Sequence, residues 1–205
     1  MATQIMKATL GRLPRYLKYL KSIEDEMPTI SATTISKALE LGEVQVRKDL
    51  SAVSGKGKPK VGYNTKELIS MLEETLGVDK INSAVIVGAG RLGRALLNYS
   101  GFEKYGLQIV AAFDSQIEKE ESVGDKKIMP MSKFKEFCLL NNIRLGIITV
   151  PKFAAQEVCD KMLQSGIEAI WNFAPTALIV PNHIVLQQEN LALSLAYLNY
   201  QLNNK

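Results

Sequence analysis

The chain is poor in the residues from which metal sites, disulfide scaffolds and catalytic dyads are built. Its 205 residues include one histidine and two cysteines. Cys138 and Cys159 lie within apolar, helix-like patterns, so we interpret them as small core residues of a protein from a reducing cytosol. No Cys/His spacing matches a metal site, and His183 has no evident acidic partner. The sequence therefore disfavours a metalloprotein, a disulfide-rich protein and acid–base catalysis by histidine.

Long hydrophobic runs are also missing. The N-terminus carries basic residues but lacks the continuous apolar region of a signal peptide, and no run is long enough to span a bilayer. We therefore expect a cytoplasmic protein without a membrane partner. The net charge of +4 is modest, so an affinity for nucleic acid has to follow from local clusters of charge. A chain of this length suits one large domain or two small ones.

The most informative stretch is an apolar run at residues 84–87 that leads into Gly-x-Gly-x-x-Gly and then into a helix-forming segment. In a dinucleotide cradle Gly88 permits the tight turn, Gly90 lets the backbone approach a pyrophosphate, and Gly93 lets helix and strand pack closely. The N-terminus of the following helix adds free N–H donors for the phosphates. The loop of the predicted dinucleotide site consists of Gly88, Ala89, Gly90, Arg91, Leu92 and Gly93.

A carboxylate follows this loop at the distance that a dinucleotide site requires. The apolar run 108–113 ends in Asp114, twenty-one residues beyond Gly93. A second strand would there deliver a carboxylate to the adenosine ribose hydroxyls, and the same charge should repel the 2′-phosphate of NADP. The alternative is a glycine turn in a βαβ unit without a ligand, which this context disfavours.

From Ile81 onward strand-like and helix-like segments alternate, which predicts a parallel sheet with right-handed crossovers, the Rossmann arrangement. We expect strands at 145–150 and 168–175, a loop at 115–127, and His183 near the end of the last strand. Ligands bind at the carboxyl ends of such strands, although a turn or core role explains each residue there equally well. We add the residues at these strand ends to the predicted cofactor site: Thr149, Val150, Pro151, Asn172, Phe173, Ala174 and Pro175.

The first eighty residues have a different pattern. The spacing of apolar residues predicts an amphipathic helix over residues 3–23, and this segment has five Lys or Arg and no acid. Pro14 should bend this helix or mark a helix start. A short helix follows, with Ile35, Ala38 and Leu39 on one side, and a second short helix is predicted at 44–50. Together they give a helix-turn-helix pattern. On the second helix Gln45, Arg47 and Lys48 are long enough to reach base edges or phosphates.

Residues 54–63 alternate lysines with turn-forming residues, which is typical of a β-hairpin wing. The window from 47 to 60 holds five basic residues against one acid, Asp49. A solvated charged loop is the alternative, but the position directly after a helix pair favours DNA binding. The predicted DNA-binding residues are Arg12, Arg15, Gln45, Arg47, Lys48, Lys56, Lys58, Lys60 and Tyr63.

The last segment, residues 189–202, is helical by its spacing and apolar around most of its circumference. Such a helix needs more than one packing surface. It could dock on its own domain, but helix-turn-helix proteins generally bind paired half-sites as two-fold dimers, which favours a dimer contact.

Together these residues resemble the Rex family of redox-sensing transcriptional repressors over almost the whole chain. The markers are Arg12-Leu13-Pro14-Arg15-Tyr16-Leu17, Gln45-Val46-Arg47-Lys48-Asp49-Leu50, Val61-Gly62-Tyr63, the glycine loop, Thr149-Val150-Pro151 and Asn172-Phe173-Ala174-Pro175. The resemblance implies an α/β protein with a winged-helix DNA-binding domain (1–80), a Rossmann domain that binds NADH or NAD⁺ (81–187), and a C-terminal domain-swapped helix (188–205).

The resemblance further implies a homodimer that binds a palindromic operator and releases it when NADH binds. The C-terminal helix would cross to the partner and pack between its two domains. The residues predicted for the dimer contact and the switch are Tyr99, Asn190, Leu191, Leu195 and Leu198. Four residues depart from the family pattern: Val53 and Ser54 replace Phe-Gly, Lys60 replaces a glycine, and Asn190 replaces an acid. The wing therefore has more positive charge, and a neutral hydrogen bond would replace an ion pair at Asn190.

Two other classes of function compete with this interpretation. A dehydrogenase would need a substrate domain and an acid/base, but the chain beyond the first domain suffices only for one dinucleotide domain and the terminal helix. A protein that binds coenzyme A or another nucleotide is the second alternative, and Asp114 disfavours it because a carboxylate there suits free ribose hydroxyls. We therefore expect a binding protein and not an enzyme.

Overall fold

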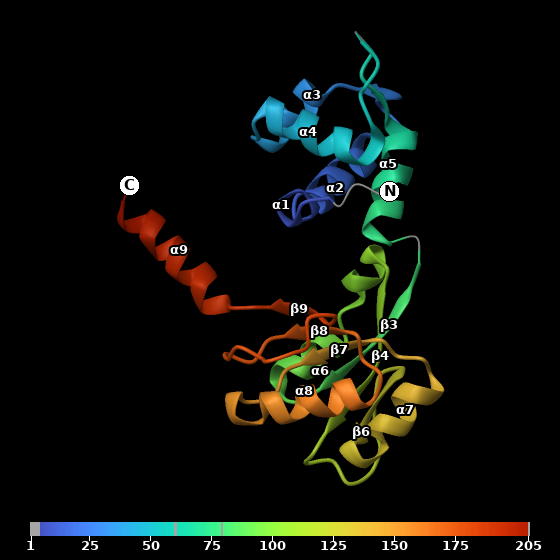
Figure 1. Ribbon diagram of the computed structural model, residues 1–205, viewed down its shortest axis with the longest axis vertical. Helices are drawn as coiled ribbons and strands as arrows, with labels where there is room; N and C mark the ends of the chain where they lie inside the picture. The colour runs from blue at the N-terminus through green and yellow to red at the C-terminus, as the bar shows by residue number, and fades with distance from the viewer. Residues whose placement is uncertain (1–4, 60, 79, 205) are drawn as a thin grey trace. The chain divides into compact units, whose positions relative to one another are not determined.

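The structure is a computed structural model that describes residues 5–59, 61–78 and 80–204. It divides into two compact units, residues 1–80 and residues 81–205. The first unit packs short helices around a core in which Tyr16, Ile35 and Leu50 are fully buried (Figure 1). Its elements are α1 (Lys7–Leu10), α2 (Leu13–Ile23), β1 (Thr29–Ile30), α3 (Ala32–Leu39), α4 (Glu43–Ser54), β2 (Tyr63–Asn64) and α5 (Thr65–Leu76).

The predicted N-terminal helix is in fact two helices. The first ends at Leu10 and the second begins at Leu13, with Pro14 in its first turn. Proline lacks an N–H and clashes with the carbonyl four residues earlier, so it is tolerated only where a helix begins. Of the two alternatives for Pro14, a bend or a helix start, the structure shows the helix start.

Helices α3 and α4 form the predicted helix-turn-helix pair. The Ser31 hydroxyl caps α3 by accepting a hydrogen bond of 3.0 Å from the Thr34 N–H, as serine commonly does at this position. The turn passes through Glu40 in the left-handed region, with φ of 53°, and α4 continues to Ser54, beyond its predicted end. Ala38, which we expected on the apolar side of α3, is exposed.

The predicted wing is a narrow hairpin. Lys58 and Gly62 exchange two backbone hydrogen bonds of 2.8 Å each, and β1 pairs with β2 in antiparallel register below it. Lys60 lies outside the described residues. The Asn64 side chain then caps α5 by accepting from the Glu67 N–H at 3.0 Å.

The second unit contains a seven-stranded sheet with the strand order β5-β6-β4-β3-β7-β8-β9. All neighbours pair in parallel except β5 and β6. From β6 onward this is the order of the Rossmann fold, so the predicted fold class is confirmed. The strands are β3 (Asn82–Val87), β4 (Leu107–Asp114), β5 (Glu121–Val123), β6 (Lys126–Pro130), β7 (Leu145–Ile148), β8 (Ala169–Asn172) and β9 (Val185–Gln188).

Helices cover both faces of this sheet (Figure 1). Val85 and Val87 of β3 pack toward α7 (Phe134–Leu140) and α8 (Ala155–Gln164), whereas Ala84 and Ile86 pack toward α6 (Arg91–Leu97). Successive side chains of a strand point to opposite faces, so two buried faces require the continuous apolar run seen in the sequence. Short 3₁₀ helices at Ser100–Tyr105, Met131–Lys133 and Lys152–Ala154 complete the unit with α9 (Leu191–Asn203).

Two local expectations for this unit are wrong. The predicted loop at 115–127 contains β5 and the start of β6, because a polar hairpin at a sheet edge has no apolar pattern to reveal it. His183 lies before β9 rather than near its end. Helix α6, which contains Gly93, ends at Leu97, and a 3₁₀ helix follows.

Candidate cofactor site and nucleic-acid interface

The three glycines of the loop have three different structural roles. Gly88 has a φ of 105°, and a Cβ there would lie 2.9 Å from the carbonyl carbon of Thr149. A Cβ on Gly93 would lie 1.9 Å from the Gly88 oxygen, so helix and strand touch at this point. A Cβ on Gly90 would meet no atom of the described residues within 4 Å. The turn at Gly88 and the close packing at Gly93 are therefore as predicted. The approach of a phosphate to Gly90 stays a prediction, and the open space there suits it.

Asp114 stands beside this loop at the end of β4. Its Oδ2 accepts a hydrogen bond of 2.6 Å from the Ala89 N–H, and its Oδ1 accepts one of 2.8 Å from the Gln116 N–H. A carboxylate offers about four lone-pair directions, so both oxygens keep capacity for ribose hydroxyls. Asp114 therefore orders the glycine loop while it remains available to a ligand.

A cavity of about 620 Å³ opens at the carboxyl ends of β3, β4 and β7, where the strand order of the sheet reverses. Its volume is in the range typical of small-molecule sites, and its place in the sheet is where Rossmann folds bind ligands. The residues predicted from the sequence that line it are Gly88, Gly90, Asp114, Thr149, Val150 and Pro151. The Thr149 hydroxyl donates to the Gly88 carbonyl at 2.7 Å and fixes one wall to the loop.

Sequence analysis missed other residues of this cavity, among them Ser115, Gln116, Met131 and Phe153. Ser115 and Gln116 directly follow Asp114, and Phe153 follows Pro151 by two residues. Extending the predicted strand ends at 114 and 150 by three residues would have found these three, whereas Met131 follows a strand whose start we had assigned to a loop. The missed residues thus belong to the loops that follow the strands.

Residues 172–175 are not among the residues that line this cavity. The fully buried Asn172 donates from Nδ2 to Gln188 Oε1 at 2.7 Å and accepts at Oδ1 from the Ala174 N–H at 3.0 Å. Phe173 packs against Trp171 with 4.6 Å between the ring centroids, and Ala174 is buried. These residues shape the turn after β8. Of the predicted loop, Ala89, Arg91, Leu92 and Gly93 likewise are not among the cavity-lining residues.

In the first unit, a basic cavity of about 550 Å³ lies between the start of α3, the face of α4 and the wing. It brings together five of the predicted DNA-binding residues, which are Arg47, Lys48, Lys56, Lys58 and Tyr63. Four cations around one groove are suited to a phosphate backbone. Arg47 forms an exposed ion pair with Glu43 one turn earlier, and such surface pairs contribute little, so Arg47 remains available to a phosphate.

Two of the predicted contacts also pack within the unit. Tyr63 lines the groove but is only 9% exposed, and a Cβ on Gly57 would lie 2.9 Å from its ring, so most of Tyr63 belongs to the core of the wing. Arg15 is exposed and donates to the carbonyl of Leu39 at 3.1 Å, which stabilises the end of α3. An aromatic ring at the base of a hairpin is expected to pack rather than project, which explains the low exposure of Tyr63.

Comparison with known proteins gives these two sites a common context. Two family models match, "CoA binding domain" at residues 79–176 and "Putative DNA-binding protein N-terminus" at residues 4–51. The redox-sensing transcriptional repressor Rex of Thermoanaerobacter pseudethanolicus is 36% identical over 205 residues, which cover 99% of this chain and 92% of that protein. The chain belongs to the Rex family. This match spans both units, whereas the match to the coenzyme A model spans only part of the second.

Solved structures agree with this assignment. The chain matches a crystal structure of RSP in complex with β-NAD⁺ and operator DNA, with a TM-score of 0.92 and 36% identity over 98% of this chain and 94% of that one. It also matches RSP in complex with β-NADH, with a TM-score of 0.87 and 35% identity over 98% and 96% of the chains. RSP is described as a Rex-family repressor. The family is one of transcriptional repressors and not of enzymes.

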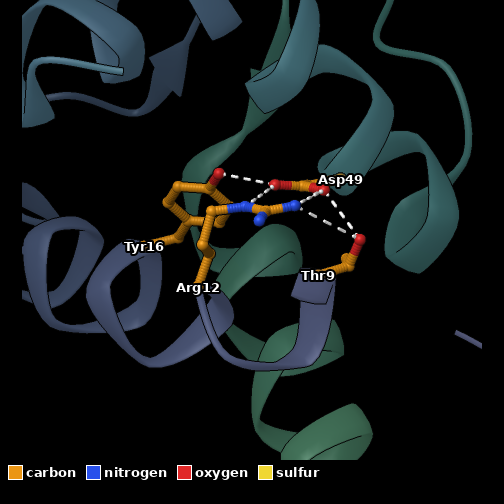
Figure 2. A network of polar contacts seen from close by, with 4 residues as sticks. All are labelled: Thr9, Arg12, Tyr16 and Asp49. Atoms are coloured by element: carbon orange, nitrogen blue, oxygen red, sulfur yellow. Dashed lines mark hydrogen bonds and ion pairs between the residues drawn. The ribbon is translucent and has the colours of Figure 1, made fainter. Parts of the chain in front are cut away.

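A buried polar network holds α4 in place (Figure 2). As the second helix of the helix-turn-helix pair, α4 is the recognition helix of this Rex-family chain. Asp49 of α4, only 3% exposed, accepts from Arg12 Nε at 2.7 Å and from Arg12 Nη2 at 2.8 Å. The Tyr16 hydroxyl donates to Asp49 Oδ2 at 2.7 Å, and the Thr9 hydroxyl donates to Asp49 Oδ1 at 2.8 Å. The guanidinium of Arg12, which we predicted to contact DNA, is therefore engaged by Asp49 within the unit.

The pKa values of the ionisable groups in this network are displaced. Burial alone would raise the pKa of the Asp49 carboxyl, but the hydrogen bonds from Arg12, Tyr16 and Thr9 outweigh burial and hold that pKa below its ordinary value. The hydrogen bond to Asp49 raises the pKa of Arg12, against the effect of burial. Burial, followed by the hydrogen bond to Asp49, raises the pKa of Tyr16 to about 12. Around neutral pH the network is thus an ion pair that binds a neutral phenol.

The C-terminal helix α9 exposes apolar side chains on several sides. Leu195 and Leu198 are 67% and 61% exposed, and Tyr197 and Tyr200 are similarly exposed. The Asn190 side chain caps the helix by accepting from the N–H groups of Ala192 and Leu193. Of the predicted switch residues, the Leu191 side chain lies outside the described part of the chain. Tyr99 is 57% exposed and stacks edge-on against Phe102.

Both cysteines are free and buried, as the sequence predicts, and burial raises the pKa of Cys138 to about 12 and that of Cys159 to about 11. Among the described residues, no group of three or more His, Cys, Asp or Glu could hold a metal ion. The helices in that part of the chain are all too short or too polar to cross a membrane.

Proposed function

We propose that this chain is a redox-sensing repressor that binds palindromic operator DNA as a homodimer and releases it when NADH is bound. The observation that carries the proposal is the combination, in one chain, of a glycine loop open at Gly90 and a basic groove between α4 and the wing. The related RSP structures, one with NAD⁺ and operator DNA and one with NADH, support the same pairing of ligands. Such a protein acts in the cytoplasm, where bacterial DNA lies.

In this proposal the second unit binds the dinucleotide through the predicted residues. The backbone of residues 88–93 receives the pyrophosphate, and Asp114 accepts from the adenosine ribose hydroxyls. Residues Thr149–Pro151, which follow β7, form a wall of the cavity, and residues 172–175 shape the turn after β8. When bound, the cofactor supplies a nicotinamide that is neutral in its reduced form and positively charged in its oxidised form. Apolar surroundings such as Phe173 favour the neutral form.

In the first unit the exposed cations of α4 and the wing contact the operator. Lys48 and Arg47 face the groove from α4, and Lys56 and Lys58 face it from the wing, to which Lys60 adds a further charge in the sequence. Phosphate contacts of this kind give affinity and register, while base-edge contacts give specificity. Operator and NADH affinities must then be coupled reciprocally, so operator DNA weakens NADH binding by the factor by which NADH weakens operator binding.

The proposal is tested by the fluorescence anisotropy of a labelled palindromic duplex, titrated with the protein and then separately with NADH and with NAD⁺. Release by NADH alone is the expected result. Equal NADH affinity with and without duplex would contradict the coupling. Turnover of a hydroxy substrate, together with no DNA binding, would instead favour the dehydrogenase alternative.

We propose residues 188–205 as a dimerisation helix that crosses to the partner, apart from the domains at 1–80 and 81–187. The exposed leucines and tyrosines of α9 support this role, because an apolar helix of this kind is expected to be covered. The double variant Leu195→Glu/Leu198→Glu should be a monomer in sedimentation analysis and should bind the operator about 100-fold more weakly, since only one half-site remains engaged. Gln201→Glu, on the same exposed helix, serves as the control and should stay dimeric. A dimeric double variant would place the interface elsewhere.

The role of Asp114 gives a prediction about cofactor choice. Asp114→Ala should weaken NADH about tenfold or more in calorimetry, because hydrogen bonds to a charged group are lost, and should reduce the preference over NADPH. Asp114→Asn keeps an acceptor of the same shape but removes the charge, so it should retain more NADH affinity while it also tolerates the 2′-phosphate. Unchanged binding of both cofactors by both variants would show that Asp114 does not contact the ribose.

A further inference from the structure

Arg12 contacts a second residue of α4 besides Asp49. Gln45 lies four residues before Asp49, so both side chains lie on the same side of the helix. With the Gln45 amide in the orientation that its neighbours require, so that its oxygen faces donors, that oxygen lies 3.0 Å from Arg12 Nη1 and 3.2 Å from both Nη2 and Nε. Nearly equal distances to three nitrogens of a planar group place this oxygen over the face of the guanidinium. Asp49 occupies two nitrogens along its edge.

This contact fixes which end of the amide is directed outward. A guanidinium has five donors, no acceptor and a permanent positive charge, so it attracts the amide oxygen and repels the amide NH₂ group. Asp49 holds Arg12 in position, and Asp49 is itself buried and held by Tyr16 and Thr9. Gln45, in contrast, is an exposed residue of the recognition helix. Its NH₂ group is therefore the part of the amide that faces solvent and an incoming ligand.

We propose that Gln45 is a specificity-determining residue that reads a base acceptor through its NH₂ group, and that Arg12 is the positioning residue that sets this polarity. The inference rests on the proposed function. Arg12 and Gln45 line a second cavity of the first unit, and Lys48 lines both that cavity and the basic groove that we assign to DNA. A glutamine with both ends free pairs with adenine through two bonds, one to the N6 amino group and one to N7. Gln45 cannot make that pair, because its oxygen is turned toward Arg12.

The consequence is a particular pattern of preference. A donor-only side chain accepts any base that presents an acceptor in the major groove, such as N7 and O6 of guanine or O4 of thymine, and it rejects the amino group of cytosine. Lys48, one turn further along α4, is also exposed and also has only donors. At the Gln45 position we therefore expect discrimination against cytosine and no special preference for adenine over guanine.

The test uses the full chain and a duplex selected by that chain from a randomised palindromic pool. Each half-site position is then changed to all four bases, and affinities are measured for the unmodified protein, for Gln45→Ala and for Gln45→Glu. The unmodified protein should bind the cytosine duplex at one position about tenfold more weakly than the best duplex. Gln45→Ala should lose this discrimination. Gln45→Glu, which keeps an oxygen toward Arg12 but has no donor, should reverse it in favour of cytosine.

The positioning role of Arg12 is tested by Arg12→Met/Asp49→Leu, which removes both charges of the buried pair and so avoids an unpaired carboxylate. With the amide free to turn, this variant should gain a preference for adenine over guanine at the same position, and Gln45→Ala in that background should abolish the gain. Circular dichroism checks that the variant is folded. Where it is not, Arg12→Lys, which keeps the charge but has no planar face, should show the same change in weaker form.

Two results would overturn the inference alone. One is a tenfold preference for adenine at the Gln45 position in the unmodified protein, which would require the amide oxygen to face the base. The other is an unchanged base preference in Gln45→Ala at every position. Failure of the unmodified protein to select any duplex would be a different outcome, because it would overturn the proposed function and this inference with it.

Discussion

Replacing Asp49 by alanine is expected to lower the free energy of unfolding of the first unit by about 3 kcal/mol and to abolish specific binding of DNA. The variant leaves the guanidinium of Arg12 without its carboxylate and removes the acceptor of the Tyr16 and Thr9 hydroxyls. Breaking one side of a buried ion pair costs about 3 to 5 kcal/mol, and the lower end applies because the Arg12 side chain keeps 23% of its exposure. DNA binding fails because α4 loses the contact that orients it.

The measurement is urea denaturation of the full chain followed by two signals. Trp171, the only tryptophan in the sequence, lies in β8 and reports the second unit, whereas circular dichroism follows both units. Asp49→Ala should therefore shift an early part of the dichroism transition and leave the fluorescence transition in place. Arg12→Met/Asp49→Leu is the matched control, and it should recover most of the lost stability because no charge remains unpaired. Equal destabilisation by both would show that the charge pair is not the cause.

The pKa shifts of this network set the pH range over which it contributes. The folded pKa of Asp49 is lowered, so its contribution is present above the ordinary carboxyl value, about 3.8, and is lost as pH falls through the folded value. The pKa of Tyr16 is raised to about 12, so its contribution is present below the ordinary phenol value of 10.0 and is lost as pH rises from there toward 12. The stability difference between the native chain and Asp49→Ala should therefore be constant from about pH 5 to 9.

The sequence predicts the elements whose function requires a fixed spacing. The three glycines, Asp114 and the loop end at Thr149 follow from the steric and electrostatic demands of a dinucleotide, so their spacing alone locates the cavity. The cations of α4 and the wing follow in the same way from the demands of a phosphate backbone. Local chemistry of this kind is readable because each residue is placed by its immediate neighbours in the chain.

Roles that depend on contacts between distant segments could not be predicted. Arg12 and Asp49 are 37 residues apart, and each alone looks like a surface charge. In the sequence Asn172 looks like a ligand-binding residue, but in the structure its amide donates to Gln188 and to a carbonyl of its own turn. In both cases the hydrogen bonds of a polar side chain are made inside the protein, and only the tertiary structure shows which polar residues are bonded in this way.

The largest effect on the switch is expected from Gly90→Val. Gly90 has a φ of −71°, which any residue adopts, and its Cβ would meet no described atom within 4 Å. The valine is therefore accommodated by the chain itself, but it fills the space that we assign to the pyrophosphate. Loss of two or more charge-assisted hydrogen bonds to that group should weaken NADH by about 100-fold or more.

Gly93→Ala is the matched comparison, because it adds one methyl group three residues away. There the new Cβ would lie 1.9 Å from the Gly88 oxygen, so the loop itself must move and the second unit should lose stability along with its NADH affinity. Gly90→Val should instead unfold like the unmodified protein by Trp171 fluorescence, bind the operator with unchanged affinity, and stay bound when NADH is added. A Gly90→Val protein that NADH still releases from DNA would show that the pyrophosphate does not pass over Gly90. The two variants thus separate a glycine required by the fold from one required by the ligand.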